Sequence, residues 1–215
     1  MKFKNLIKST CAVVAVIATS TVANAAPITG LFNTGVDGSG LALAAGSNDT
    51  HYAIIAPAQQ AVVIQNSIPG TWLPHTGTRR WVWEHVSGQT PLNVTRTFRT
   101  TFDLTGLDPL TAAISGQWAT DNTGLDILIN GVSSGNTCGG FSALCNFSVG
   151  TGFTAGVNTL DFVVRDAGGW AGLLVSSISG EARELQNGTI PEPATLALFG
   201  FGLAGLGFAR RKKIA

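Results

Sequence analysis

The chain has 215 residues, with 13 Lys and Arg against 12 Asp and Glu, and a formal net charge of +1. Seven of the basic residues lie in the first eight and last six positions, which leaves residues 26–190 with six arginines, eleven acids and no lysine. A central region with a net charge of −5 is a poor binder of nucleic acid, because phosphate contacts depend on Lys and Arg.

Residues 1–25 are predicted to be a signal peptide. Three lysines precede a short apolar run at 11–18, and Ala23-Asn24-Ala25 is a cleavage site of the A-x-A type. The alternative is a permanent N-terminal membrane helix, for which the apolar run is too short. We therefore expect signal peptidase to cut after Ala25 and the chain to be exported across the inner membrane.

Residues 26–182 are predicted to form an all-β ectodomain, an antiparallel two-sheet sandwich or jelly roll. The region is rich in Gly, Thr, Ser and Asn, which suits short strands joined by tight turns. Apolar and polar residues alternate most clearly at 97–104, 125–130 and 159–165. Further strands are expected at 51–56, 60–65, 81–86, 110–118, 144–149 and 172–179. In the second segment, Leu125, Ile127 and Ile129 are predicted to share one face.

Two cysteines, Cys138 and Cys145, remain once the signal peptide is removed. An even pair in an exported domain favours a disulfide. The bond would close a Gly-rich loop, either as a staple on that loop or as the support of a rigid binding loop. A metal site is disfavoured, because no C-x-x-C motif or nearby histidine completes a ligand set.

No catalytic motif is recognisable in the chain. The H-E-x-x-H pattern is missing, and the eleven acids show no marked pair. We therefore predict that the protein is not an enzyme.

A second feature of the middle region is its order of turns and apolar steps. FDLTG (102–106) is followed by Trp118, by Asp121-Asn122, by ILINGV (127–132), by VNTLDFVVRD (157–166) and by GLLVSSISGEA (172–182). This order resembles the galactose-binding-like β-sandwich. The resemblance implies a jelly roll that binds sugar and that often carries a structural calcium ion.

The resemblance directs attention to two sets of residues. Asp121, Asn122 and Asp126 are the candidate calcium ligands, although Asp and Asn also stabilise turns through their own backbone. Trp72 and Trp170, which stand beside Pro or Gly in predicted loops, are the candidate sugar contacts.

The C-terminal region joins three elements in order. After a polar spacer at 183–190 come Pro191-Glu192-Pro193, an apolar run at 194–209 that we expect to form a transmembrane helix, and a basic cluster. The cluster consists of Arg210, Arg211, Lys212 and Lys213. The two prolines are predicted to keep the segment before the apolar run extended and accessible to a protease.

Residues 191–215 resemble the PEP-CTERM sorting signal of Gram-negative bacteria. That resemblance implies processing by an exosortase, a membrane protease that cuts near the Pro-Glu-Pro motif. The helix would anchor the protein in the membrane only until cleavage, after which the protein would move to the cell surface or the extracellular matrix.

These expectations combine into one leading hypothesis, a non-catalytic surface protein whose sandwich domain binds extracellular polysaccharide. One alternative is a structural or adhesive envelope protein without a sugar site. The other is an enzyme that acts on the polysaccharide.

Overall fold

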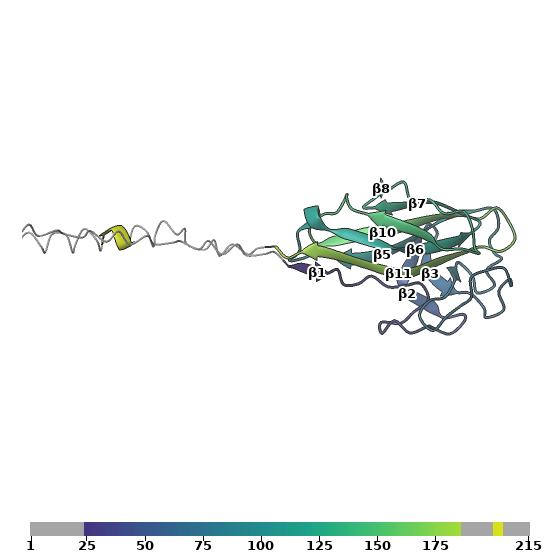
Figure 1. The fold of residues 1–215 in the computed structure, drawn as a ribbon. Coiled ribbons are helices and arrows are strands. Elements are labelled where there is room, and N and C mark those ends of the chain that lie inside the picture. Colours follow the sequence, from purple (N-terminus) through teal and green to yellow (C-terminus); the bar gives the residue numbers. More distant parts are fainter. Residues whose placement is uncertain (1–23, 186–199, 204–215) are drawn as a thin grey trace, which may run out of the picture. The chain divides into compact units, whose positions relative to one another are not determined.

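The computed structural model describes residues 24–185 and 200–203 (Figure 1). The predicted signal peptide up to residue 23, the Pro-Glu-Pro motif and the basic cluster lie outside the described residues. Within them, no helix is long and apolar enough to cross a membrane. Of the predicted transmembrane run, only residues 200–203 are described, and they are helical.

Residues 24–185 form one compact unit built almost entirely from antiparallel strands, as the sequence predicted. The single short helix of this unit is the 3-10 turn η1 (Pro109–Thr111). The strands are β1 (Ala25–Pro27), β2 (Asn48–Ile55), β3 (Ala58–Val63), β4 (Val82–Trp83), β5 (Thr95–Asp103), β6 (Ala113–Asp121), β7 (Thr123–Ile129), β8 (Val132–Ser133), β9 (Cys145–Val149), β10 (Val157–Arg165) and β11 (Gly172–Arg183).

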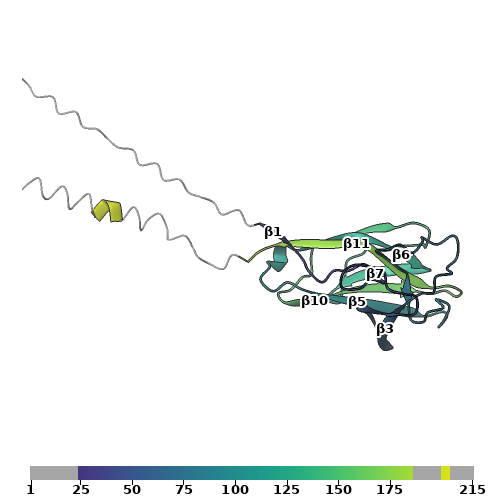
Figure 2. The ribbon, with the colours of Figure 1, turned by 90° about the horizontal axis from the view of Figure 1, so that it is seen from below.

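The strands are arranged in two layers, which Figure 2 shows with β11 and β6 on one side and β10 and β5 on the other. Hydrogen bonds run through both layers in the order β8-β7-β10-β5-β2-β3-β4-β11-β6-β9. Strand β1 pairs with the C-terminal end of β11, at Glu181–Arg183. The short strands β3 and β4 therefore join the two layers along one side of the sandwich.

Aromatic side chains from both layers fill the space between them. Trp118 of β6 and Phe147 of β9 each lie with their ring centroid 5.7 Å from that of Phe162 on β10. All three are buried, and Leu160 and Val164 lie on the same face of β10 as Phe162. The predicted inward faces of 97–104 and 159–165 are thus confirmed, as expected from the two-residue period of a strand.

One predicted core residue, Leu125, does not join this core. Its side chain is 42% exposed, whereas Ile127 and Ile129 are buried. The register explains the difference, because Val163 pairs with Asp126 and Val164 pairs with Gly124, which leaves Leu125 as an extra residue on β7. This β-bulge turns Leu125 away from the core, and the alternation of the sequence alone did not show it.

The outer edge of β9 is capped at Ser148 by a side chain. The amide of Asn136 donates to the carbonyl oxygen of Ser148 at 3.1 Å and accepts from the Ser148 N–H at 3.4 Å. It thereby takes the place that a neighbouring strand would occupy. Two other strands leave little edge free, since β8 has two residues and β1 ends in Pro27, which has no N–H.

Gly124 offers a direct test of the packing between the layers. A Cβ atom at this position would lie 2.7 Å from Cζ3 of Trp118, which is too close for any real contact. We expect Gly124→Ala to lower the free energy of unfolding by about 2 kcal/mol, as overpacking does elsewhere. Urea denaturation of both proteins measures this change. Gly38→Ala is the control, because a Cβ at Gly38 meets no atom within 4 Å, and an equal loss in both variants would contradict the packing argument.

Candidate functional site

Loops that are far apart in the sequence meet at one end of the sandwich. Strand β6 ends at Asp121, which pairs with Gly172 at the start of β11. The loop 64–80 and the disulfide loop are joined there, since Leu73 N–H donates to the carbonyl of Phe141. We call this end the distal end, and the opposite end, where β11 finishes, the proximal end.

The distal end holds a cluster of aromatic rings. Trp72 lies with its ring centroid 4.3 Å from that of Trp81 and 6.4 Å from that of Phe141. Trp170 meets Trp72 edge-on at 5.7 Å. Trp72 is only 5% exposed and Trp81 is fully buried, whereas Trp170 is partly exposed. We refer to these four residues as the distal aromatic cluster.

The two predicted sugar-contact tryptophans therefore differ in kind. The structure brings Trp72 and Trp170 together, although 98 positions separate them in the sequence. Trp72 is not the exposed loop residue that the sequence suggested, because Trp81, Phe141 and Trp170 cover its rings. Trp170 and Phe141 are the members of the cluster that keep a surface toward solvent, and Trp170 meets the buried Trp72 edge-on.

Asp121 holds Trp72 in place. Its Oδ2 accepts a hydrogen bond from Trp72 Nε1 at 2.9 Å, while its buried Oδ1 has no partner among residues 24–185. Burial raises the pKa of the Asp121 carboxyl to about 6; the hydrogen bond from Trp72 opposes this rise, and the charge of Asp166 adds to it. Folding therefore favours the protonated form of this carboxyl.

The neighbouring polar groups are occupied by backbone donors. Both carboxylate oxygens of buried Asp166 accept hydrogen bonds, from the N–H groups of Asn93 and Gly168. Asn122 Oδ1 accepts from the N–H of Ala167. The Ala167 bond fastens the loop that carries Trp170 to the end of β6, and the Asn93 bond fastens it to the segment before β5.

The three candidate calcium ligands are engaged separately. Asp121 bonds to Trp72, Asn122 bonds to Ala167, and Asp126 Oδ1 accepts from the N–H groups of Ile127 and Gly135. In the described part of the chain, no group of three or more His, Cys, Asp or Glu side chains is placed to hold a metal ion. Backbone N–H groups thus occupy the oxygens of Asn122 and Asp126, in the first case across 45 positions of the sequence.

The predicted disulfide is present, with Cys138 and Cys145 joined and their Cα atoms 5.7 Å apart. Cys138 also exchanges two backbone hydrogen bonds with Gly124 on β7, and Cys145 is the first residue of β9. The bond therefore holds both ends of the loop that contributes Phe141 to the distal aromatic cluster. Closing a loop of eight residues lowers the entropy of the unfolded chain and so stabilises the folded domain by about 2.5 kcal/mol.

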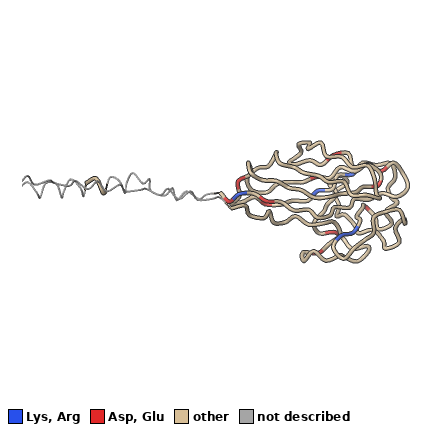
Figure 3. The backbone as a smooth tube through the Cα atoms, in the orientation of Figure 1, with Lys and Arg blue, Asp and Glu red and all other residues tan. Residues whose placement is uncertain are grey.

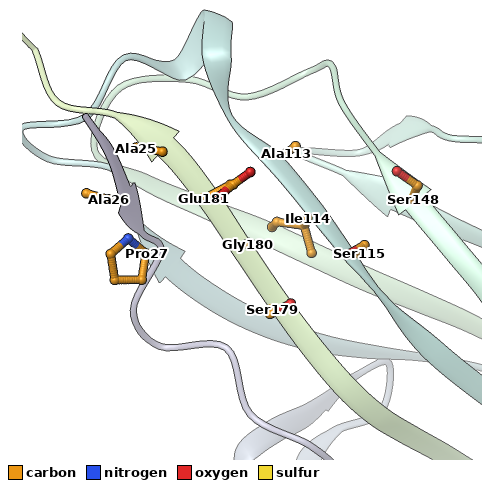
Figure 4. Close-up of a pocket in the computed structure, with 10 residues that line it drawn as sticks. All are labelled: Ala25, Ala26, Pro27, Ala113, Ile114, Ser115, Ser148, Ser179, Gly180 and Glu181. Atoms are coloured by element: carbon orange, nitrogen blue, oxygen red, sulfur yellow. The ribbon is translucent and has the colours of Figure 1, made fainter. Parts of the chain in front are cut away.

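The surface near the proximal end carries a shallow groove of about 540 Å³ across β1, β11, β6 and β9 (Figure 4). We call it the proximal groove. Small side chains line it, among them Ser115, Ser148 and Ser179, and Glu181 is its one charged residue. Ala25, the predicted signal-cleavage residue, lies in its wall as the first residue of β1.

The three histidines contact neighbouring side chains of the domain. His75 Nδ1 accepts from Arg80 Nε at 3.0 Å, and burial together with the Arg80 charge lowers the pKa of His75 to about 4. His51 stacks on Phe32. His85 contacts the hydroxyl of Ser87, but the adjacent Glu84 is paired with Arg96 and does not orient the imidazole.

Comparison with protein families gives one match. Residues 189–213 match the PEP-CTERM protein-sorting motif. This match supports an exported, surface-directed protein that is processed by an exosortase, and it covers only 25 residues near the C-terminus. Comparisons with curated proteins and with solved structures gave no match.

The raised pKa of the Asp121 carboxyl should make the free energy of unfolding depend on pH. Its pKa is about 6 in the folded protein against an ordinary value of 3.8, so the folded state holds an extra proton between these values. Stability from this group is therefore present at about pH 4 and is lost as the pH rises through about 6. Over this pH range the free energy of unfolding of the wild type should fall by about 2 kcal/mol because of this group. Asp121→Asn keeps an oxygen for Trp72 but cannot titrate, so we expect it not to show this fall.

Urea denaturation of both proteins at pH 4, 5, 6 and 7.5 measures the difference. Asp49 also has a pKa raised by burial, but it is common to both proteins and cancels. Parallel stability curves would contradict the assignment to Asp121.

Proposed function

We propose that this exported protein binds extracellular polysaccharide through the distal end of its sandwich domain, without catalysing a reaction. The observation that carries the proposal is the placement of Trp170. Its partly exposed ring rests on the buried Trp72 at the end of the domain farthest from the chain that leads to the sorting motif.

The two ends of the described domain lie together at the proximal end. Ala26, the expected first residue of the mature protein, pairs with Ala182 of β11, and Leu185 N–H donates to the carbonyl of Gly106. The sorting motif begins four residues after Leu185. Attachment at the proximal end leaves the distal loops free to meet the polymer outside the cell.

The chemistry of the distal end suits a sugar. An indole ring offers an apolar face to the C–H groups of a pyranose, and nearby polar groups bond its hydroxyls. Trp170 packs beside Gly88, to whose carbonyl Ala171 N–H donates at 2.7 Å. Ser87 and Gln89 flank Gly88 in the sequence, and their hydroxyl and amide groups are of the kind that bond sugar hydroxyls.

The likeness of the turn order to the galactose-binding-like sandwich agrees with this proposal, and the antiparallel two-layer fold is compatible with it. The binding experiment is done with and without calcium, because Asp121, a candidate calcium ligand, is hydrogen-bonded to Trp72. An adhesive or structural role would instead show as self-association, and an enzyme would release reducing ends from the polymer.

Replacing Trp170 tests the proposed contact. We expect Trp170→Ala to weaken binding to the polysaccharide of the producing bacterium about tenfold, because central aromatic anchors carry much of the affinity of a site. Co-sedimentation of the exported protein with the purified polymer, with and without a calcium chelator, measures the change.

Two further variants complete this experiment. Trp170→Phe keeps an aromatic face and should retain most of the binding. Leu110→Ala removes a more accessible apolar side chain, 90% exposed, at the proximal end and should have no effect. Equal binding by wild type and Trp170→Ala would place the contact elsewhere or refute polysaccharide binding.

The two predicted cleavages can be read from the mass of the mature protein. We expect the surface form to begin at Ala26 and to end near Pro191–Pro193, because signal peptidase and exosortase each remove one terminal segment. Intact mass spectrometry of the extracellular fraction measures both ends. A surface form that retains Ile214-Ala215 would exclude cleavage of the sorting segment.

A further inference from the structure

The proximal base is the surface formed by residues 103–111, 156–157 and 181–185. Its parts are fastened to one another, since Asp108 N–H donates to the carbonyl of Arg183 and Leu104 N–H donates to that of Gly156. Val157 pairs with Asp103 across β10 and β5. The proximal groove opens beside this base and shares Glu181 with it.

Three large apolar side chains stand out from the proximal base. Leu110 is 90% exposed, Val157 is 69% exposed and Leu185 is 47% exposed. Leu110 is held rigidly at the tip of η1, where the side chain of Asp108 caps its N–H. Exposed apolar side chains gathered on one surface are typical of a region that contacts a partner.

The same surface is acidic. Asp103, Asp108, Glu181 and Glu184 lie on it with one cation, Arg183, which gives a net charge of −3. The two ion pairs of the described domain involve other residues, so these acids are not neutralised by arginine there. Figure 3 shows acidic residues gathered at this end. A mature N-terminus at Ala26 would add one positive charge and leave the base acidic.

The length of chain beyond the base limits what can lie next to it. Leu185 is six residues before Pro191. Even fully extended, six residues span only about 21 Å. When a protease holds the Pro-Glu-Pro motif, the proximal base must therefore lie beside that protease or beside the membrane in which it is embedded.

Charge distinguishes between these two neighbours. Bacterial membranes carry anionic lipids, which repel a surface with net charge −3 and no lysine. A protein surface with basic and apolar groups complements both features of the base. We propose that the proximal base docks on a basic, partly apolar surface of the exosortase while the motif is cut, so that the folded domain takes part in its own processing.

This inference rests on the proposed exosortase processing and adds a second recognition element to the motif. Its test uses the full-length chain, expressed in a Gram-negative strain that contains an exosortase. The variant is Leu110→Ser with Glu181→Gln and Glu184→Gln, and the sorting segment is unchanged. We expect processing to slow about five- to tenfold, as loss of rim charges and one apolar contact does at other interfaces.

Pulse-chase labelling followed by separation of the cut and uncut forms measures the rate of processing. Leu41→Ser is the matched control, since Leu41 is 60% exposed and belongs to the turn that closes between Asp37 and Leu41, outside the base. Thermal unfolding of each released protein checks that the domain remains folded. Processing of the triple variant at the wild-type rate would overturn docking by the base and leave the proposed processing intact.

An insertion variant separates docking from simple obstruction. Ten Gly and Ser residues inserted between Asn187 and Gly188 lengthen the connection without changing the base or the motif. If docking assists cleavage, the insertion slows it; faster cleavage would show that the domain only obstructs the protease. Absence of processing in the wild type would refute both the processing and the docking.

Membrane binding would give a different result. Released wild-type protein that sediments with phosphatidylglycerol vesicles, when the triple variant does not, would assign the base to lipid and overturn the proposal.

Discussion

The architecture depends on β11, the longest strand of the described domain, which has neighbours along both of its edges. On one side it pairs with β6 from Gly172 to Glu181, and on the other it meets β4 at Leu173 and β1 at Ala182. Between those two contacts, Thr34 bonds to Val175 through its backbone and its hydroxyl. Because both neighbours fix this strand, its two ends are fixed as well. One end supports the distal aromatic cluster, and the other delivers the chain to the sorting segment.

The length of β11 separates two surfaces of different chemistry. Twelve residues in a strand extend for about 36 Å. The distal end offers the aromatic ring of Trp170 on a rigid support. Trp72 forms this support and is itself held by Asp121 and by Phe141 of the Cys138–Cys145 loop. The proximal base offers acidic and apolar side chains close to the point of cleavage. A ligand bound at one surface therefore leaves the other unobstructed, and maturation and binding need not compete.

Local sequence patterns predicted the strands but not the contacts that make a site. The segments 97–104 and 159–165 were recognisable because a two-residue alternation directly reports a half-buried strand. The bulge at Leu125 was not, since it depends on the register with β10. Trp72 does lie in a loop, as predicted, but its burial could not be read from the sequence, because Asp121, its hydrogen-bond partner, lies 49 positions away. The proximal base escaped prediction because three distant segments build it. The disulfide could be predicted, because only two cysteines remain in the exported domain.

Asn136 has a consequence for life outside the cell. Proteins released into an extracellular matrix accumulate at high local density, where an open strand edge is a template for cross-β growth. By bonding both backbone polar groups of Ser148, the Asn136 side chain removes that residue of the β9 edge from such pairing. A neighbouring copy of the domain therefore meets an edge that is interrupted at Ser148, which disfavours edge-to-edge growth when copies lie close together.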